Sequence, residues 1–116
     1  MPDPKRGEIW WVDFNPTQGS EIRKKRPAVV ISSDSQGALP LRLVAPITEW
    51  KKQFSKNIWH VKIDPNNNNG LTKLSAVDVM QVRSADIIRF KSKWGKASSQ
   101  IVEEIVTALA IVIEYQ

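Results

Sequence analysis

Three side chains of this sequence could together cleave a phosphodiester bond of RNA. Attack of a 2′-hydroxyl on the neighbouring phosphate needs a group that takes the proton, positive charge on the phosphorane, and a donor to the leaving 5′-oxygen. Arg26 offers charge and a two-pronged donor, and Thr48 offers a hydroxyl. Glu21 offers a carboxylate that could accept the proton or orient Arg26. The residue types permit this chemistry without establishing it.

Other classes of chemistry lack their residues in this chain. It contains no cysteine, which excludes a thiol nucleophile, a disulfide framework and a thiolate metal site. His60 is the only histidine, and a lone histidine favours a place on a strand face over an acid–base role. HExxH motifs, paired aspartates and glycine-rich phosphate loops are absent. We therefore expect neither a metal nor a cofactor.

Positive charge is concentrated in three segments of the chain. Seventeen Lys and Arg against twelve Asp and Glu give a net charge of +5, which predicts attraction to polyanions. One cluster is Arg23 to Arg26, and the others lie within 51–62 and 89–96, where aromatic residues are interleaved with the lysines. Cations for phosphates and rings for bases favour nucleic acid. The alternative is that the rings are core residues beneath a solvated face.

The chain carries no segment that predicts membrane insertion. Its longest apolar run, Ala108 to Ile113, is far too short to span a bilayer. Without cysteine the chain is indifferent to redox compartment, so we expect a cytoplasmic protein with no membrane partner.

The hydrophobic pattern predicts a single, mainly β domain over residues 1–116. Strands are expected at 7–14, 27–33, 41–48, 58–63 and 75–82. The asparagine-rich stretch 65–70 is expected to be a flexible connection, and residues 83–95 fit no clear pattern. From Ser98 onward apolar residues recur at helical spacing. The expected architecture is a small SH3-like barrel or a strongly twisted antiparallel sheet with a C-terminal helix packed on it.

Four segments resemble the MazF/PemK (Kid) toxins of type II toxin–antitoxin modules. They are Arg6–Glu21, Arg26–Ser32, Ala45–Thr48 and Ser75–Ser84, in this order and followed by a helix. Each segment alone is moderately specific. Four of them with matching gaps span nearly the whole chain, which makes a chance match improbable.

The resemblance implies a sequence-selective, metal-independent endoribonuclease that acts as a homodimer, with an RNA groove formed partly by the dimer interface. Family members cut single-stranded mRNA to a 2′,3′-cyclic phosphate and a 5′-hydroxyl, and an antitoxin with a disordered tail neutralises them by occupying the groove. The family's catalytic residues correspond to Arg26, Thr48 and Glu21. RNA contacts are expected from Ser20, Arg23, Lys24, Lys25, Lys51, Lys52, Gln81 and Arg83.

Two positions depart from the family pattern. Residues 22–25, IRKK, replace the glutamine and small residues that usually follow the Ser-Glu pair, and we interpret these cations as added phosphate contacts or as a solvated loop. Met80 replaces an acid found in many relatives. Either Glu21 and Arg26 suffice, or activity is weak or absent. The alternative function is therefore a non-catalytic binder on the same fold, similar to the gyrase poison CcdB or to an RNA-binding relative.

Overall fold

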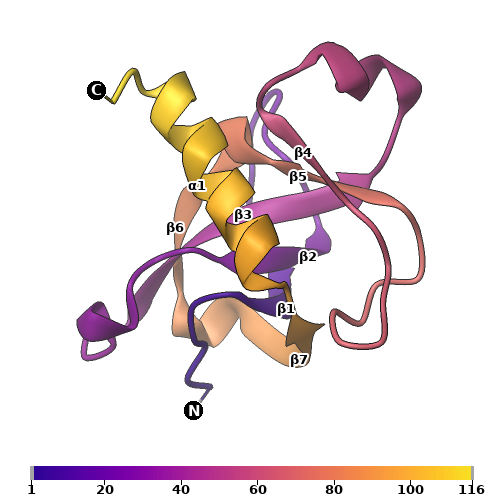
Figure 1. The fold of residues 1–116 in the computed structure, drawn as a ribbon. Helices are drawn as coiled ribbons and strands as arrows, with labels where there is room; N and C mark the ends of the chain where they lie inside the picture. The colour runs from indigo at the N-terminus through magenta and orange to yellow at the C-terminus, as the bar shows by residue number, and fades with distance from the viewer. Residues whose placement is uncertain (1, 116) are drawn as a thin grey trace.

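The computed structural model describes residues 2–115, which form a strongly twisted antiparallel sheet with a helix packed across it (Figure 1). Within these residues the sheet has seven strands, of which six follow the order β4-β5-β3-β2-β1-β7 and the seventh, β6, pairs with β3 beside this path. The elements are β1 (Glu8–Asp13), β2 (Lys25–Val30), β3 (Leu41–Glu49), β4 (His60–Ile63), β5 (Ser75–Asp78), β6 (Arg83–Asp86), β7 (Phe90–Lys96) and α1 (Ser99–Val112). The predicted fold class is confirmed, with an open and twisted sheet.

Alternating residues of the central strands build two small cores, one on each face of the sheet. Val29 and Ala45 are fully buried on one face, where they pack in the same cluster as Ile105 of α1. Ala28 and Val44 are fully buried on the other face. Because successive side chains of a strand point to opposite faces, β2 and β3 are buried on both sides along their middle. Their ends remain available to carry functional groups.

Helix α1 begins where the sequence predicts and packs on the sheet through one face. The Ser98 hydroxyl accepts a hydrogen bond from the backbone N–H of Ile101 at 3.2 Å, which caps the first turn. Val102, Ile105 and Ala108 are buried against the sheet. Across residues 2–115, no helix combines the length and the apolar character needed to cross a membrane.

The stretch from residue 75 to residue 95 differs from the predicted elements. The expected strand 75–82 stops at Asp78, whose carboxylate accepts a hydrogen bond from the N–H of Met80 and begins a 3-10 turn, Val79–Gln81. The unassigned residues 83–95 form most of β6 and β7. Their pattern is weak because β7 pairs only with β1 and most of its side chains are exposed. Because few side chains of this edge strand are buried, its sequence shows little alternation of apolar and polar residues.

The prediction that residues 65–70 form a flexible connection is wrong. The Asn69 side chain is only 1% exposed. Its carbonyl oxygen accepts hydrogen bonds from the N–H groups of Asn66 at 3.1 Å and Leu71 at 3.0 Å, and its amide donates to the carbonyl of Asp64 at 2.8 Å. One buried amide thus closes the loop on itself, which composition alone does not reveal.

Candidate functional site

Arg26 and Thr48 meet across the ladder between β2 and β3. The register pairs Ala28 with Pro46, so two residues further along Arg26 lies opposite Thr48 on the same face. An Nη1 group of Arg26 donates to the Thr48 hydroxyl at 3.4 Å, and Nε donates to the carbonyl of Arg23 at 3.1 Å. The second bond fixes the guanidinium, whereas the first is long and would yield readily to an anionic oxygen.

Glu21 belongs to the loop between β1 and β2, which is held from outside. Its carboxylate accepts a hydrogen bond from the N–H of Gln18 at 2.6 Å. The Gln81 side chain accepts from the N–H of Ile22 at 3.2 Å and donates to the carbonyl of Ser20 at 3.1 Å. Gln81 was expected to contact RNA, and the structure shows it first as a clamp on the loop that carries Glu21.

A first concave surface, here called the loop hollow, lies beside this clamp. Its volume is about 610 Å³, and it is lined by Phe14, Ser20, Glu21, Ile22, Pro46, Met80, Gln81, Val82, Arg83 and Ser84. Glu21 is the one carboxylate and Arg83 the one cation of this lining among the described residues. Met80 is 58% exposed there. The hollow therefore contains a carboxylate although Met80 stands where many relatives have an acid, because Glu21 lies in the same lining.

A second concave surface, here called the tryptophan hollow, has a volume of about 350 Å³. It is lined by Trp11, Lys24, Lys25, Arg26, Pro27, Ile47, Thr48, Glu49, Leu71, Thr72, Lys73, Ser75 and Trp94. Arg26 and Thr48 line this hollow, and by strand register they share a sheet face with Pro46 of the loop hollow. The pair thus stands on the boundary between the two hollows. Four cations against one carboxylate give the second hollow a positive potential.

Some of the other residues predicted to contact RNA line one of the two hollows, and the rest lie outside both. Ser20 and Arg83 line the loop hollow, and Lys24 and Lys25 line the tryptophan hollow. Arg23 is exposed on the loop, where its guanidinium donates to the carbonyl of Gly19 at 3.3 Å. Lys51 and Lys52 are exposed after the end of β3 and line neither hollow.

Glu21 and Arg26 do not form an ion pair in the part of the chain that the structure describes. The expectation that Glu21 orients Arg26 therefore has no direct contact behind it. The carbonyl of Arg23 orients the guanidinium instead, and this signal was not visible in the sequence because it depends on the path of the loop backbone.

His60 lies outside both hollows, on a strand face. Its side chain is 8% exposed and stacks on Phe54, with ring centroids 3.8 Å apart. Burial lowers the pKa of His60, and the carboxylate of Asp78, 3.7 Å from Nε2, opposes that shift only in part. Burial also raises the pKa of Asp78. The imidazole is therefore neutral at pH 7 and forms part of the support of β4 and β5.

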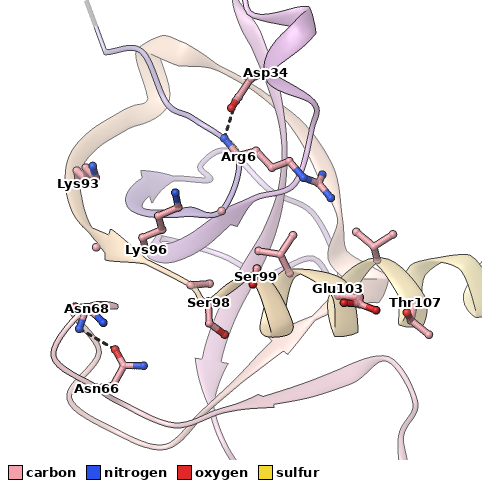
Figure 2. Close-up of a pocket in the computed structure, with 15 residues that line it drawn as sticks. Arg6, Asp34, Asn66, Asn68, Lys93, Lys96, Ser98, Ser99, Glu103 and Thr107 are labelled. Atoms are coloured by element: carbon pink, nitrogen blue, oxygen red, sulfur yellow. Dashed lines mark hydrogen bonds between the residues drawn. The ribbon is translucent and has the colours of Figure 1, made fainter.

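A larger cavity, of about 960 Å³, lies near the beginning of α1 (Figure 2). Two of its three cations are already engaged: Lys93 forms an ion pair with Glu8 at 2.8 Å, and the Arg6 guanidinium donates to the carbonyl of Ile31. The backbone N–H of Arg6 also donates to Asp34, as Figure 2 shows. The residues with reactive potential line the two smaller hollows, so we place the candidate site there and not in the larger cavity.

Known proteins match both the sequence and this arrangement. The family model described as PemK-like, MazF-like toxin of type II toxin-antitoxin system matches residues 5–113. Endoribonuclease MazF9 of Mycobacterium tuberculosis is 48% identical over 113 residues, covering 92% of this chain and 93% of the relative. The fold resembles the crystal structure of MazF from Deinococcus radiodurans (TM-score 0.82, 24% identity, 98% of this chain and 99% of that chain) and the structure of a mycobacterial endoribonuclease in complex with its cognate antitoxin (TM-score 0.77, 16% identity, 97% of both chains). The chain belongs to the PemK-like, MazF-like family of type II toxin–antitoxin toxins.

Proposed function

We propose that this protein, as one domain of residues 1–116, is a toxin that acts as a sequence-selective endoribonuclease on single-stranded mRNA. The observation that carries the proposal is the Arg26–Thr48 pair, which joins a guanidinium and a hydroxyl on the boundary between two concave surfaces. Membership of the toxin family and a 48% identical relative named as an endoribonuclease support the same function.

The proposed reaction is internal transfer of the phosphate without a metal. The 2′-oxygen attacks phosphorus, the bond to the 5′-oxygen breaks, and the products are a 2′,3′-cyclic phosphate and a 5′-hydroxyl. Glu21 takes the proton of the 2′-hydroxyl, and Arg26 neutralises the extra charge on the phosphorane. Thr48 donates a hydrogen bond to the leaving 5′-oxygen, which receives its proton from water.

The RNA would run across both hollows and past the pair between them. Lys24 and Lys25 in the tryptophan hollow and Arg83 in the loop hollow supply cations for its phosphates. Ser20 and Gln81 offer polar groups in the loop hollow. Arg23, Lys51 and Lys52 would contact parts of the RNA that extend beyond the two hollows. Single-stranded RNA suits this surface because its bases and 2′-hydroxyls are both accessible.

The proposed partners are a cognate antitoxin and a second copy of the chain, in the cytoplasm where mRNA is translated. Solved complexes of similar folds support the first partner: one is titled as an endoribonuclease with its cognate antitoxin, and others as MazE-MazF from Deinococcus radiodurans. The positively charged tryptophan hollow would accept an acidic antitoxin segment as readily as RNA.

The decisive experiment incubates wild-type protein with a long single-stranded RNA in EDTA, maps the cut ends and identifies their phosphates. We expect cuts at one short sequence, ending in a cyclic phosphate. Arg26→Ala should abolish cleavage while leaving the melting temperature unchanged, because Arg26 is partly exposed at the end of a strand. Arg26→Lys is the matched variant, since it keeps the charge and loses the planar fork. Full activity in a folded Arg26→Ala protein would refute the assignment.

The role of Glu21 is tested by moving the carboxylate within the loop hollow. Glu21→Gln should remove most activity, because the amide cannot take the proton of the 2′-hydroxyl. Because Met80 lines the same hollow, adding Met80→Glu to Glu21→Gln should restore part of the rate. A fully active Glu21→Gln protein would show that another group takes the proton.

A binding protein without catalysis is the second candidate, and the exposed Met80 in the loop hollow is the observation that favours it. This function predicts RNA binding or gyrase binding with no cut RNA in the same assay. Cleavage that depends on Arg26 would exclude it.

A further inference from the structure

Trp94 occupies an irregular position on the edge strand β7. In the ladder between β1 and β7, Ile9 pairs with Gly95 and Trp10 pairs with Lys93, so Trp94 is the extra residue between two consecutive pairs. Such a bulge turns the extra side chain away from the direction that regular alternation would give it. Here it brings the Trp94 indole onto the indole of Trp11.

The two indoles form a parallel stack at the surface. Their ring centroids are 5.1 Å apart and their planes differ by 5°. Trp94 nevertheless remains 38% exposed, while Trp11 is half-buried behind it. Leaving an indole exposed to water costs free energy. The Trp94 ring is therefore an apolar surface that does not contribute to the core, and such surfaces often bind a ligand or partner.

The backbone behind Trp94 is fixed by the loop that Asn69 closes. The N–H of Lys96 donates to the carbonyl of Asn68 at 2.8 Å. Gly70 and Gly95 face this contact, and a Cβ atom on Gly70 would overlap the backbone of Trp94, while one on Gly95 would overlap the backbone of Asn68 and Asn69. The close approach holds Trp94 in place before any ligand arrives. A pre-positioned ring loses little entropy when it binds.

The surroundings of the stack match a single-stranded nucleic acid. Lys24, Lys25, Arg26 and Lys73 line the same hollow, against Glu49 as the one acid of its described lining. Proteins that bind single strands combine cations along the backbone with aromatic rings on which bases stack. Arg26 and Thr48 also line this hollow, but the register turns their side chains to the sheet face opposite Trp11, together with Ala28 and Pro46. A base on Trp94 would therefore belong to a nucleotide that lies across the ends of β2 and β3 from the bond that is cut.

We propose that Trp94, backed by Trp11, is a stacking platform for one nucleobase of the bound RNA, within two nucleotides of the scissile phosphate. This proposal rests on the proposed ribonuclease function and deepens it, because it assigns a residue that positions the substrate. The platform would contribute to kcat/KM through binding and alignment, and every base could use it because each has a flat face.

The test uses short RNAs that contain the mapped cut sequence and carry an abasic nucleotide at each of the two positions on either side of the cut. Wild-type, Trp94→Phe and Trp94→Leu proteins are compared by kcat/KM. Trp10→Phe is the matched control, because Trp10 is the neighbouring residue on the other face of β1, where its ring meets the edge of Phe90. Melting curves and sedimentation check the fold and the oligomeric state of each variant.

We expect Trp94→Leu to lose about tenfold or more on intact RNA, and Trp94→Phe to keep most of the activity. At one position the abasic nucleotide should lower the wild-type rate by a similar factor and leave the rate of Trp94→Leu unchanged, because each change removes the same contact. A 2-aminopurine at that position, in a 2′-deoxy oligonucleotide that cannot be cut, should be quenched by wild-type protein and not by Trp94→Leu.

Other results would overturn the proposal in distinguishable ways. Independent effects of Trp94→Leu and the abasic site at all four positions would leave the ribonuclease intact and remove the platform. Loss of antitoxin affinity with unchanged cleavage would assign the indole to the antitoxin, and a change in sedimentation would assign it to an interface between copies. If wild-type protein cuts no RNA, the proposed function fails first and the platform fails with it.

Discussion

Two loops flank the Arg26–Thr48 pair, and each has one side chain that makes several bonds to its backbone, from outside the loop in one case and from within it in the other. The loop of residues 14–24, between β1 and β2, is fastened from outside by the side chain of Gln81, which bonds its backbone on either side of Glu21. The loop of residues 64–74, between β4 and β5, is fastened from inside by the buried amide of Asn69. The first loop lines the loop hollow and the second lines the tryptophan hollow.

This difference determines what each loop can do. A loop closed on itself is a fixed wall, and the structure uses it as the backing of Trp94. A loop clamped by a distant side chain takes its position from that side chain, so Glu21 depends on the turn at the end of β5. We therefore expect damage to the inner fastening to appear as lost stability, and damage to the outer fastening to appear as lost activity.

The largest effect is expected from Asn69→Ala. Removing the buried amide leaves two backbone N–H groups and one carbonyl without their partner, which should lower the free energy of unfolding by about 3 kcal/mol. Denaturant titration measures this change. Asn67→Ala is the control, because Asn67 is an exposed neighbour in the same loop. Equal stability of the two variants would contradict the internal fastening.

A smaller effect is expected from Gln81→Ala, and it should appear in activity and not in stability. Loss of both bonds to the loop should lower kcat about tenfold, equal to about 1.4 kcal/mol of activation free energy. The melting temperature should hardly change, because the loop is exposed. Met80→Ala, one residue away, serves as the control for the turn itself. If Gln81→Ala lowered stability as much as Asn69→Ala, the contrast between the loops would be lost.

Two pairs of lysines, Lys24 with Lys25 at the start of β2 and Lys51 with Lys52 after the end of β3, should differ in how much they contribute to the salt dependence of RNA binding. Lys24→Ala combined with Lys25→Ala should reduce the slope of log K against log salt by about 1.4, as expected for two phosphate contacts on a single strand. Binding is measured with an Arg26→Ala background so that the RNA stays whole. The double change Lys51→Ala and Lys52→Ala tests the predicted contacts outside the hollows. An effect of the same size there would extend the RNA path beyond the end of β3.

The smallest expected effect concerns pH and the support of the Gln81 turn. Asp78 begins that turn, and the buried His60 lies against Asp78. The folded-state pKa of His60 is lowered by burial, so in the window from about 6.5 down to that lowered pKa the unfolded chain binds more protons than the folded one. Stability should therefore fall modestly as pH decreases through this window. His60→Gln should flatten the curve there, and an unchanged slope would show that another group titrates.

The fold and the proposed catalytic pair were predicted from the sequence through different signals. The strands at 27–33 and 41–48 were recognisable from their apolar residues because β2 and β3 are buried on both faces along their middle. The family resemblance singled out Arg26 and Thr48, and only the strand register shows that they touch. Periodicity could not locate β7, since it is an edge strand with one neighbour and mostly exposed side chains.

The parts that remained hidden depend on contacts between distant segments. A run of asparagines looks like a linker, and nothing in its composition tells that Asn69 is the buried one. Trp94 could have been a core, interface or stacking residue, and its orientation follows from a bulge that exists only when β7 is paired with β1. Gln81 reads as a polar residue near a site, and its role as a clamp depends on a loop about sixty residues earlier in the chain.

The register between β2 and β3 also has a consequence for insertions and deletions. Three consecutive pairs, Ala28 with Pro46, Val29 with Ala45 and Val30 with Val44, set the alignment that brings Arg26 to Thr48. A single residue added or lost within 26–30 or 44–48 would turn one partner of the pair to the opposite face. The connection from 33 to 39 could change in length without that result, because it lies beyond the paired residues and beyond Ile31 and Ser32, which bond to the backbone of Leu43. Toxins of this fold can therefore vary the length of that connection and still inherit the same guanidinium and hydroxyl side by side.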